Sequence, residues 1–464
     1  MGEFGQVKTK GPSNLETALK EYRKKFKDKS GLDWEKRNDE PKSGKYTFIE
    51  KNYDSDDGED ASANIETNEG LDAPVVPCKL PLKTQRLMEL IFNENHFNSV
   101  LQQIGYNANK LPLGKLGKST LKKGFEHLKE LSSLINQPSL AQSKHGLSHH
   151  AVSPCLFTLH NQLCPKILTN QSNPYQQAIL DFSNKYYSTI PHDFGRCNPP
   201  PINNDDILKR EVEMLDTLTD MEVANSIMKS GSAKVSKDAE AISIVDKRFN
   251  DLGMAEMTAL DHGSQEYQEL KEYLVSSSGA THGLLYRLED IFRIERRGEE
   301  ERFAQSKFSK LKDKNRLLLW HGSRTTNFGG ILSQGLRIAP PEAPMNGYAF
   351  GKGIYMADCS SKSANYCLAG MSGGVGLLLL CEAELSNPTY EIACGDSNAQ
   401  QMAEKHNCIS TKGVGRTVPQ KWKDAGCVNE KLKGVMMVSF ILILFFGTSR
   451  GERGVVKIKS LADC

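Results

Sequence analysis

The sequence predicts a multidomain protein with three folded parts: a small α+β unit, an all-helical bundle and a larger α+β domain. Three observations lead to this prediction. An acidic stretch at residues 56–75 lacks periodicity and is poor in aromatic residues, which is typical of a linker. Apolar residues at helical spacing follow it to about residue 230. Short apolar runs bounded by Gly, Asp and Pro begin after about residue 253.

Composition narrows the class of protein. The 464 residues are 38% hydrophobic and 25% charged, which are ordinary values for globular domains. The formal charge of +2 predicts that any nucleic-acid contact comes from a local patch. The start, MGEFGQ, fits neither a secretory signal nor a myristoylation site. Eleven cysteines without a CxxC pair favour a reducing, intracellular setting, and the longest apolar run, Val435–Phe446, is too short to span a membrane.

Residues 1–55 form the first predicted unit. Leu19, Tyr22 and Phe26 stand at helical spacing within Glu16–Ser30, so we expect a helix there. The lysines between them are either a solvated face or a set of phosphate contacts. Lys45–Ile49 predicts a short strand.

Residues 76–245 predict an all-α bundle. We expect Ser119 to cap one helix and Asp205 to begin another, because apolar residues recur at helical spacing after each. An atypical insert at about residues 149–177 has no period and contains three prolines. Its potential metal ligands fit no zinc-binding spacing, so no metal is predicted. These residues are His149, His150, Cys155, His160 and Cys164.

Residues 250–437 predict an α+β domain with strands at Leu317–Trp320, Gly353–Ala357 and Leu377–Leu385. Its most informative stretch is Trp320–Tyr366. A His-Gly-Ser sequence follows a buried strand there, glycines permit close approach of a ligand, and tyrosines offer flat faces for a ring. Together these residues predict a ligand site.

The same stretch closely resembles the catalytic signature of the poly(ADP-ribose) polymerases, particularly those that respond to DNA damage. APPEAP, FGKGIY and SKSANYC stand intact within it. Leu80–Leu134 and Ile190–Arg196 resemble the family's helical regulatory domain. Residues 1–53 resemble its WGR domain, which binds broken DNA, and the chain is expected to begin inside that domain. The resemblance therefore implies a partial WGR unit, a helical regulatory domain and an ADP-ribosyltransferase fold with an incomplete C-terminus.

The resemblance also implies a role for individual residues. His321, Tyr355 and Lys352 would be catalytic, with His321 on the adenosine ribose of NAD⁺ and Lys352 near the reacting ribose. The nicotinamide carboxamide would pair with the Gly322 backbone and Ser363, while Tyr355 and Tyr366 bracket the ring. Further cofactor-binding residues are Ser323, Asn327, Gly330, Arg337 and Tyr348.

By resemblance, the protein is a nuclear NAD⁺ ADP-ribosyltransferase that releases nicotinamide and acts in DNA repair. NAD⁺ would be its substrate, without a metal. Its partners would be broken DNA with a 5′ phosphate and protein acceptors, including itself and chromatin proteins, with no membrane partner. An NAD-dependent oxidoreductase is a weaker alternative because no GxGxxG motif lies between a strand and a helix.

The tail departs from the family pattern. A family glutamate in an Asn-Glu-Tyr context would stabilise the oxocarbenium-like transition state, but it is not found. Glu430 precedes the expected place and Glu452 lies in a Gly/Arg-rich segment. The atypical tail, residues 438–464, together with the insert, suggests the hypothesis of retained non-coding sequence. Its apolar start would either form a replacement strand or promote aggregation. The alternative function is therefore a catalytically impaired scaffold that binds DNA ends and NAD⁺.

Overall fold

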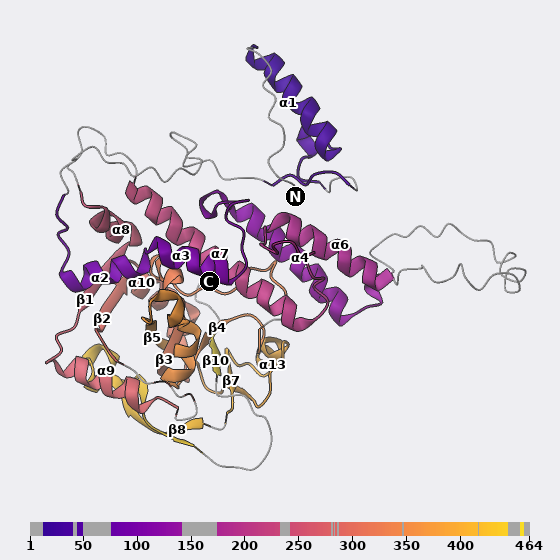
Figure 1. Ribbon diagram of the computed structural model, residues 1–464. Helices are drawn as coiled ribbons and strands as arrows, with labels where there is room; N and C mark the ends of the chain where they lie inside the picture. The colour runs from indigo at the N-terminus through magenta and orange to yellow at the C-terminus, as the bar shows by residue number, and fades with distance from the viewer. Residues whose placement is uncertain are drawn as a thin grey trace, which may run out of the picture. The chain divides into compact units, whose positions relative to one another are not determined.

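A computed structural model describes most of the chain (Figure 1). The described residues are 13–39, 44–49, 76–141, 174–232, 242–279, 282, 284, 287–345, 348–415, 417–443 and 455–458. They divide into two compact units, Met1–Asn52 and Tyr53–Cys464, and each is considered by itself. The mixture of helical and α+β parts confirms the predicted multidomain fold class.

The first unit is built on one helix, α1 (Leu15–Ser30). The Asn14 side chain accepts a hydrogen bond from the Thr17 amide at its start, and Gly31 ends it in a left-handed conformation with φ of 78°. Trp34 packs edge-on against Phe26 and Phe48. A short 3₁₀ turn, η1 (Trp34–Lys36), carries this tryptophan.

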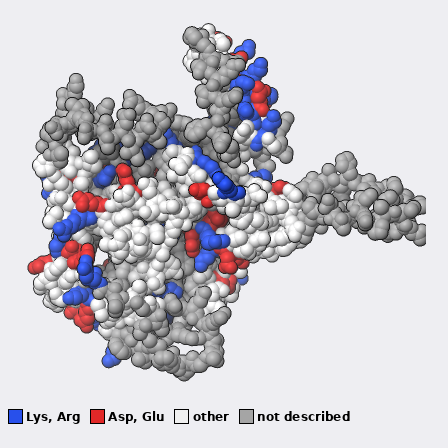
Figure 2. All heavy atoms as spheres, in the orientation of Figure 1, with Lys and Arg blue, Asp and Glu red and all other residues white. Residues whose placement is uncertain are grey.

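The prediction of a strand at Lys45–Ile49 is wrong. These residues belong to no strand of the described part of the chain. The Tyr46 amide donates a backbone hydrogen bond to the carbonyl of Lys29. Phe48 packs against the rings of Phe26 and Trp34 instead of joining a sheet, while Tyr46 is 62% exposed. Figure 2 shows basic residues along α1 with acidic ones among them.

The second unit begins with helices. They are α2 (Leu82–Ile91), α3 (Glu94–Gln103), η2 (Leu113–Lys115), α4 (Lys118–Asn136), α6 (Pro174–Thr189), α7 (Asp205–Ser232) and α8 (Ile244–Leu252). Leu121, Phe125 and Leu128 on α4 are at most 4% exposed, as their helical spacing predicts. Ser119 is not the cap of α4, since Gly117 occupies that position. The predicted insert and its candidate metal ligands lie outside the described residues, except for residues 174–177, which begin α6.

The α+β part follows in the same unit. Its helices are α9 (Gln265–Ser276), α10 (Glu299–Gln305), η5 (Lys307–Lys310), η6 (Thr325–Asn327), α11 (Phe328–Gln334), α12 (Ser360–Ala364), η7 (Asn365–Cys367), η8 (Ala369–Ser372), α13 (Ala399–Lys405), η9 (Ala425–Cys427) and η10 (Glu430–Leu432). Its strands are β1 (Met254–Ala259), β2 (Phe292–Arg296), β3 (Arg316–Ser323), β4 (Ile354–Met356), β5 (Leu377–Glu384), β6 (Tyr390–Ile392), β7 (Ser410–Gly413), β8 (Thr417–Asp424), β9 (Met436–Ile443) and β10 (Val455–Ile458). The three strands predicted from apolar runs correspond to β3, β4 and β5.

The described strands form two four-stranded sheets and one two-stranded sheet. β1 pairs with β2, and the larger sheets have the orders β5-β3-β9-β8 and β4-β10-β7-β6. β3 and β5 pair antiparallel along their whole lengths, from Arg316 opposite Glu384 to Ser323 opposite Leu377. Backbone hydrogen bonds between Trp320 and Ala357 link the two sheets at the strand that carries the predicted site.

The apolar run at Val435–Phe446 contributes β9, which pairs antiparallel with β8 and touches β3 at Leu317. Met437 and Val438 are fully buried in the core with Trp320 and Tyr273. Of the two alternatives for this apolar run, a strand is the one found at residues 436–443. β10 lies between β4 and β7, where Lys457 stands opposite Tyr355 in the backbone register (Figure 1).

Candidate active site

The site begins at the end of β3. The apolar run before His321 holds β3 in the core, and the chain then turns polar at Ser323. His321 Nδ1 donates a hydrogen bond to the carbonyl oxygen of Tyr355 at 2.9 Å, which fixes the ring and leaves Nε2 as the acceptor. Burial lowers the pKa of His321, with the bond to Tyr355 opposing it. The imidazole is therefore neutral near pH 7 and can accept a hydrogen bond from a ligand hydroxyl.

Gly322 lies in backbone contact with α12. A Cβ atom at position 322 would stand 1.8 Å from the carbonyl oxygen of Ser363, so only glycine fits. The Ser363 hydroxyl donates to the carbonyl of Trp320 at 2.8 Å. Gly322 and Ser363, which are 41 positions apart in the sequence, thus meet at one point. Together they place a backbone amide, a carbonyl and a hydroxyl within one small region.

The three predicted tyrosines differ in their surroundings. The Tyr355 hydroxyl accepts from the Phe350 amide at 3.0 Å and donates to the Gly351 carbonyl at 2.6 Å, so its ring is fixed. Burial raises its pKa above the usual range. Tyr366 is 61% exposed and presents its ring to solvent. Tyr348 instead donates to Asp216 on α7 at 2.9 Å.

The remaining predicted residues lie along the same side of the domain. Asn327 donates to the Ser323 hydroxyl at 3.0 Å, which joins η6 to the end of β3. Lys352 donates to the carbonyls of Pro340 and Pro341 at 2.7 and 3.1 Å, and burial lowers its pKa. The Pro-rich loop is therefore held to the segment that carries Tyr355.

Helix α7 covers part of this region, which the sequence did not predict. Asp220 on α7 accepts from Arg337 at 2.5 Å, and its backbone lies against Gly330 on α11. Thr217 accepts from Arg324 at 3.0 Å. Burial raises the pKa of Asp216 to about 7, an effect that the bond from Tyr348 opposes.

A signal for these α7 residues was present in the sequence. Asp216 and Asp220 stand four residues apart within an apolar helical stripe. Carboxylates on the buried face of a helix normally have partners, because burying an unpaired charge is costly. The partners themselves, Tyr348 and Arg337, could be found only from the tertiary structure.

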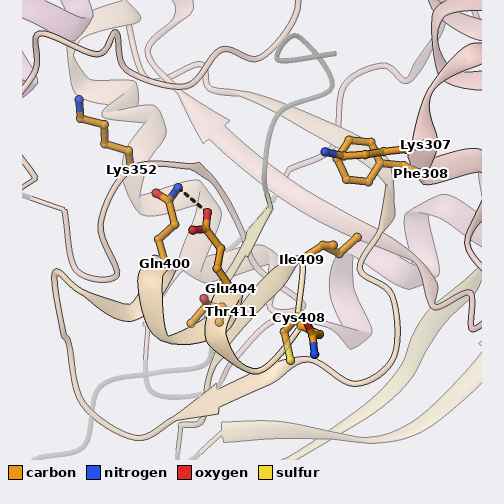
Figure 3. Close-up of a pocket in the computed structure, with 10 residues that line it drawn as sticks. Lys307, Phe308, Lys352, Gln400, Glu404, Cys408, Ile409 and Thr411 are labelled. Carbon is orange, nitrogen blue, oxygen red and sulfur yellow. Dashed lines mark hydrogen bonds between the residues drawn. The ribbon is translucent and has the colours of Figure 1, made fainter.

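One cavity lies beside this region. It has a volume of about 240 Å³ and is lined by residues of η5, α13 and β7 together with Lys352. Figure 3 shows Lys352 on one side, Lys307 and Phe308 on the other, and a hydrogen bond between Gln400 and Glu404. Lys352 is the single predicted site residue among the lining residues in this cavity.

No group of three or more His, Cys, Asp or Glu side chains among the described residues is arranged to hold a metal ion. Within the same described part of the chain, every helix is too short or too polar to cross a membrane.

Comparison with known proteins gives three family matches. A poly(ADP-ribose) polymerase catalytic-domain model matches residues 264–436, the regulatory-domain model matches residues 78–249, and a WGR-domain model matches residues 1–41. All three correspond to the parts expected from the sequence.

Curated relatives give the same picture. Poly [ADP-ribose] polymerase 2 of Homo sapiens is 34% identical over 422 residues, which covers 90% of this chain and 63% of that protein. Poly [ADP-ribose] polymerase 2-A of Oryza sativa subsp. japonica is 36% identical over 424 residues, covering 90% and 56%. Poly [ADP-ribose] polymerase 1 of Gallus gallus is 35% identical over 417 residues, covering 90% and 36%. The chain therefore spans between about one third and two thirds of the length of these relatives.

Proposed function

Because the chain belongs to the poly(ADP-ribose) polymerase family, we propose that it transfers ADP-ribose from NAD⁺ to proteins and releases nicotinamide. The observation that carries this proposal is the meeting of Gly322, Ser363, His321 and Tyr355 at the junction of the two sheets. Backbone polar groups, a hydroxyl, a neutral imidazole and a fixed aromatic ring are the groups needed to hold a nicotinamide with its ribose.

The proposed chemistry is a displacement at the ribose carbon that bears nicotinamide. The bond from this carbon to the ring nitrogen breaks, its electron pair leaves with nicotinamide, and an acceptor oxygen or nitrogen on a protein attacks and loses its proton. The Gly322 backbone and Ser363 would hold the carboxamide, and Tyr355 would lie against the ring. His321 Nε2, free to accept, would bind a ribose hydroxyl. Holding the leaving group in one orientation lowers the entropic cost of reaching the transition state.

We propose that α7 restrains this site. Asp216 accepts a hydrogen bond from the Tyr348 hydroxyl, and Asp220 accepts one from the Arg337 guanidinium. Without these bonds both donors would be available to NAD⁺. The pairs lie between the helical bundle and the catalytic part of one compact unit. Release of α7 would free both groups, so the bundle acts as a brake on binding of the dinucleotide.

The signal that releases the brake is proposed to be a DNA break bearing a 5′ phosphate. The first unit matches the WGR model over residues 1–41, and α1 carries lysines suited to phosphate contact. DNA binding, modification of the protein itself and of chromatin proteins, and a nuclear location all follow from this proposal.

A specific observation favours a second function, binding of NAD⁺ and DNA ends without transfer. The strand beside Tyr355 is β10, whose sequence Val-Val-Lys-Ile contains no carboxylate. The family model ends its match at residue 436, and residues 438–464 contain a single glutamate, Glu452. A transition state with positive charge on the ribose would lack the negative partner that speeds such reactions.

The deciding experiment is label transfer from NAD⁺ onto protein, with and without nicked DNA carrying 5′ phosphates. DNA-stimulated labelling that disappears in His321→Ala, but persists in the exposed control His406→Ala, supports the transferase. If labelling is absent while NAD⁺ still binds in a calorimetric titration, the scaffold function is correct. If neither labelling nor NAD⁺ binding occurs in folded protein, both proposals are wrong.

A further inference from the structure

Three segments distant in the sequence meet at one fully buried serine. Ser277 follows the last residue of α9 and is 0% exposed. Its hydroxyl accepts a hydrogen bond from the indole nitrogen of Trp320 at 3.0 Å. Its carbonyl accepts from the Ser360 amide at 2.9 Å. A single residue therefore joins α9 to both β3 and α12.

The two partners of Ser277 lead directly to the proposed carboxamide contacts. Trp320 precedes His321 and Gly322 on β3, and its carbonyl accepts from the Ser363 hydroxyl at 2.8 Å. Ser360 begins α12, the helix that carries Ser363. Trp320 is 5% exposed and Ser360 is 0% exposed, so water cannot replace these bonds easily.

The end of α9 makes further contacts with the same two elements. The Ser360 hydroxyl donates to the Leu274 carbonyl at 2.7 Å, and the Tyr273 hydroxyl donates to the Leu318 carbonyl at 2.6 Å. The rings of Tyr273 and Trp320 lie 4.9 Å apart. The C-terminal end of α9 thus holds β3 and α12 from the same side.

We propose that Ser277 is a positioning residue, which sets the distance between the Gly322 backbone and the Ser363 hydroxyl and so the affinity for the nicotinamide carboxamide. This inference rests on the proposed function. Loss of the Ser277 hydroxyl leaves the buried indole N–H of Trp320 without this acceptor, so the indole shifts to find another. The shift passes to Gly322 and Ser363, whose backbones already touch.

The test is a calorimetric titration of the full chain with nicotinamide alone. We expect Ser277→Ala to weaken nicotinamide binding about tenfold, and Ser277→Thr, which keeps the hydroxyl, to bind within about twofold of wild type. Ser410→Ala is the matched control. Ser410 begins β7 in the other sheet, is 2% exposed, and donates its hydroxyl to the Leu385 carbonyl at 2.8 Å. This control should lower the Tm and leave nicotinamide affinity unchanged.

The outcomes separate the two ideas. Wild-type protein that fails to bind nicotinamide overturns the proposed function and this inference together. Wild type and Ser277→Ala binding equally well overturns the positioning role alone. Equal weakening in Ser277→Ala and Ser410→Ala shows a general loss of structure and also overturns it. If Ser277→Ala does not fold, Ser277→Cys, whose thiol is a weaker acceptor, takes its place. This variant should bind nicotinamide several-fold more weakly than wild type. Wild-type affinity in Ser277→Cys would refute the positioning role.

Discussion

Substituting Gly322 by alanine tests the geometry of the proposed nicotinamide site most directly. The added Cβ would lie 1.8 Å from the Ser363 carbonyl oxygen, whereas ordinary contact begins at 3.4 Å. The difference, 3.4 − 1.8, requires the two backbones to separate by 1.6 Å. The backbone fixes the position of the Cβ atom, and the oxygen is itself a backbone atom, so no side-chain rotation relieves the overlap.

The expected loss follows from the contacts that Gly322 would make. Two hydrogen bonds to the carboxamide, at about 0.5–1.5 kcal/mol each, amount to roughly 1–3 kcal/mol. That energy corresponds to roughly 5- to 150-fold in affinity, and displacement of Ser363 adds to it. We therefore expect Gly322→Ala to bind nicotinamide at least about 100-fold more weakly, with the protein destabilised by about 1–3 kcal/mol from the forced overlap.

The assay pairs a nicotinamide titration with urea unfolding. Gly370→Ala is the control, because its Cβ would meet nothing within 4 Å. It should change affinity and stability by less than about 0.5 kcal/mol. A folded Gly322→Ala protein that binds nicotinamide within about threefold of wild type would refute the contact between the Gly322 backbone and the carboxamide.

Three further predictions concern the brake and the helical bundle. Gly329→Ala places a Cβ 2.7 Å from that of Ala224 on α7 and should raise labelling without DNA, while the double variant with Ala224→Gly should restore the wild-type level in part. Burial raises the pKa of Asp216 to about 7 from the usual 3.8, so the folded protein holds a proton that the unfolded chain releases. The free energy of unfolding should therefore fall as pH rises from about 4 to about 7. In urea unfolding, Asp216→Asn should reduce this fall by more than about 1.4 kcal/mol. Parallel plots of unfolding free energy against pH for the two proteins would contradict the prediction. Glu211 accepts from the buried His192 at 2.8 Å, so Glu211→Ala should destabilise the bundle by about 3–5 kcal/mol, and a change below about 1 kcal/mol would show that the pair is unimportant.

The sequence predicted the elements whose patterns are local. Leu121, Phe125 and Leu128 follow the period of a helix, and Leu317–Trp320 is a short apolar run bounded by polar residues, so α4 and β3 were predictable. The strand at Lys45–Ile49 was not, because a short run with apolar and aromatic residues shows only that some of its side chains are buried. It does not show whether the burying partner is a strand or, as for Phe48, an aromatic cluster on a helix.

The chain alone also determined the family and the residue types of the site, since the motif from Trp320 to Tyr366 is nearly continuous. Tertiary structure decided how those residues are arranged. It placed the Gly322 and Ser363 backbones in contact, joined Trp320 to Ser277, and set Asp216 and Asp220 against Tyr348 and Arg337. The physical reason is that motif spacing reflects local conformation. Contacts between residues up to 132 positions apart depend on how packed elements cross, which no local pattern encodes.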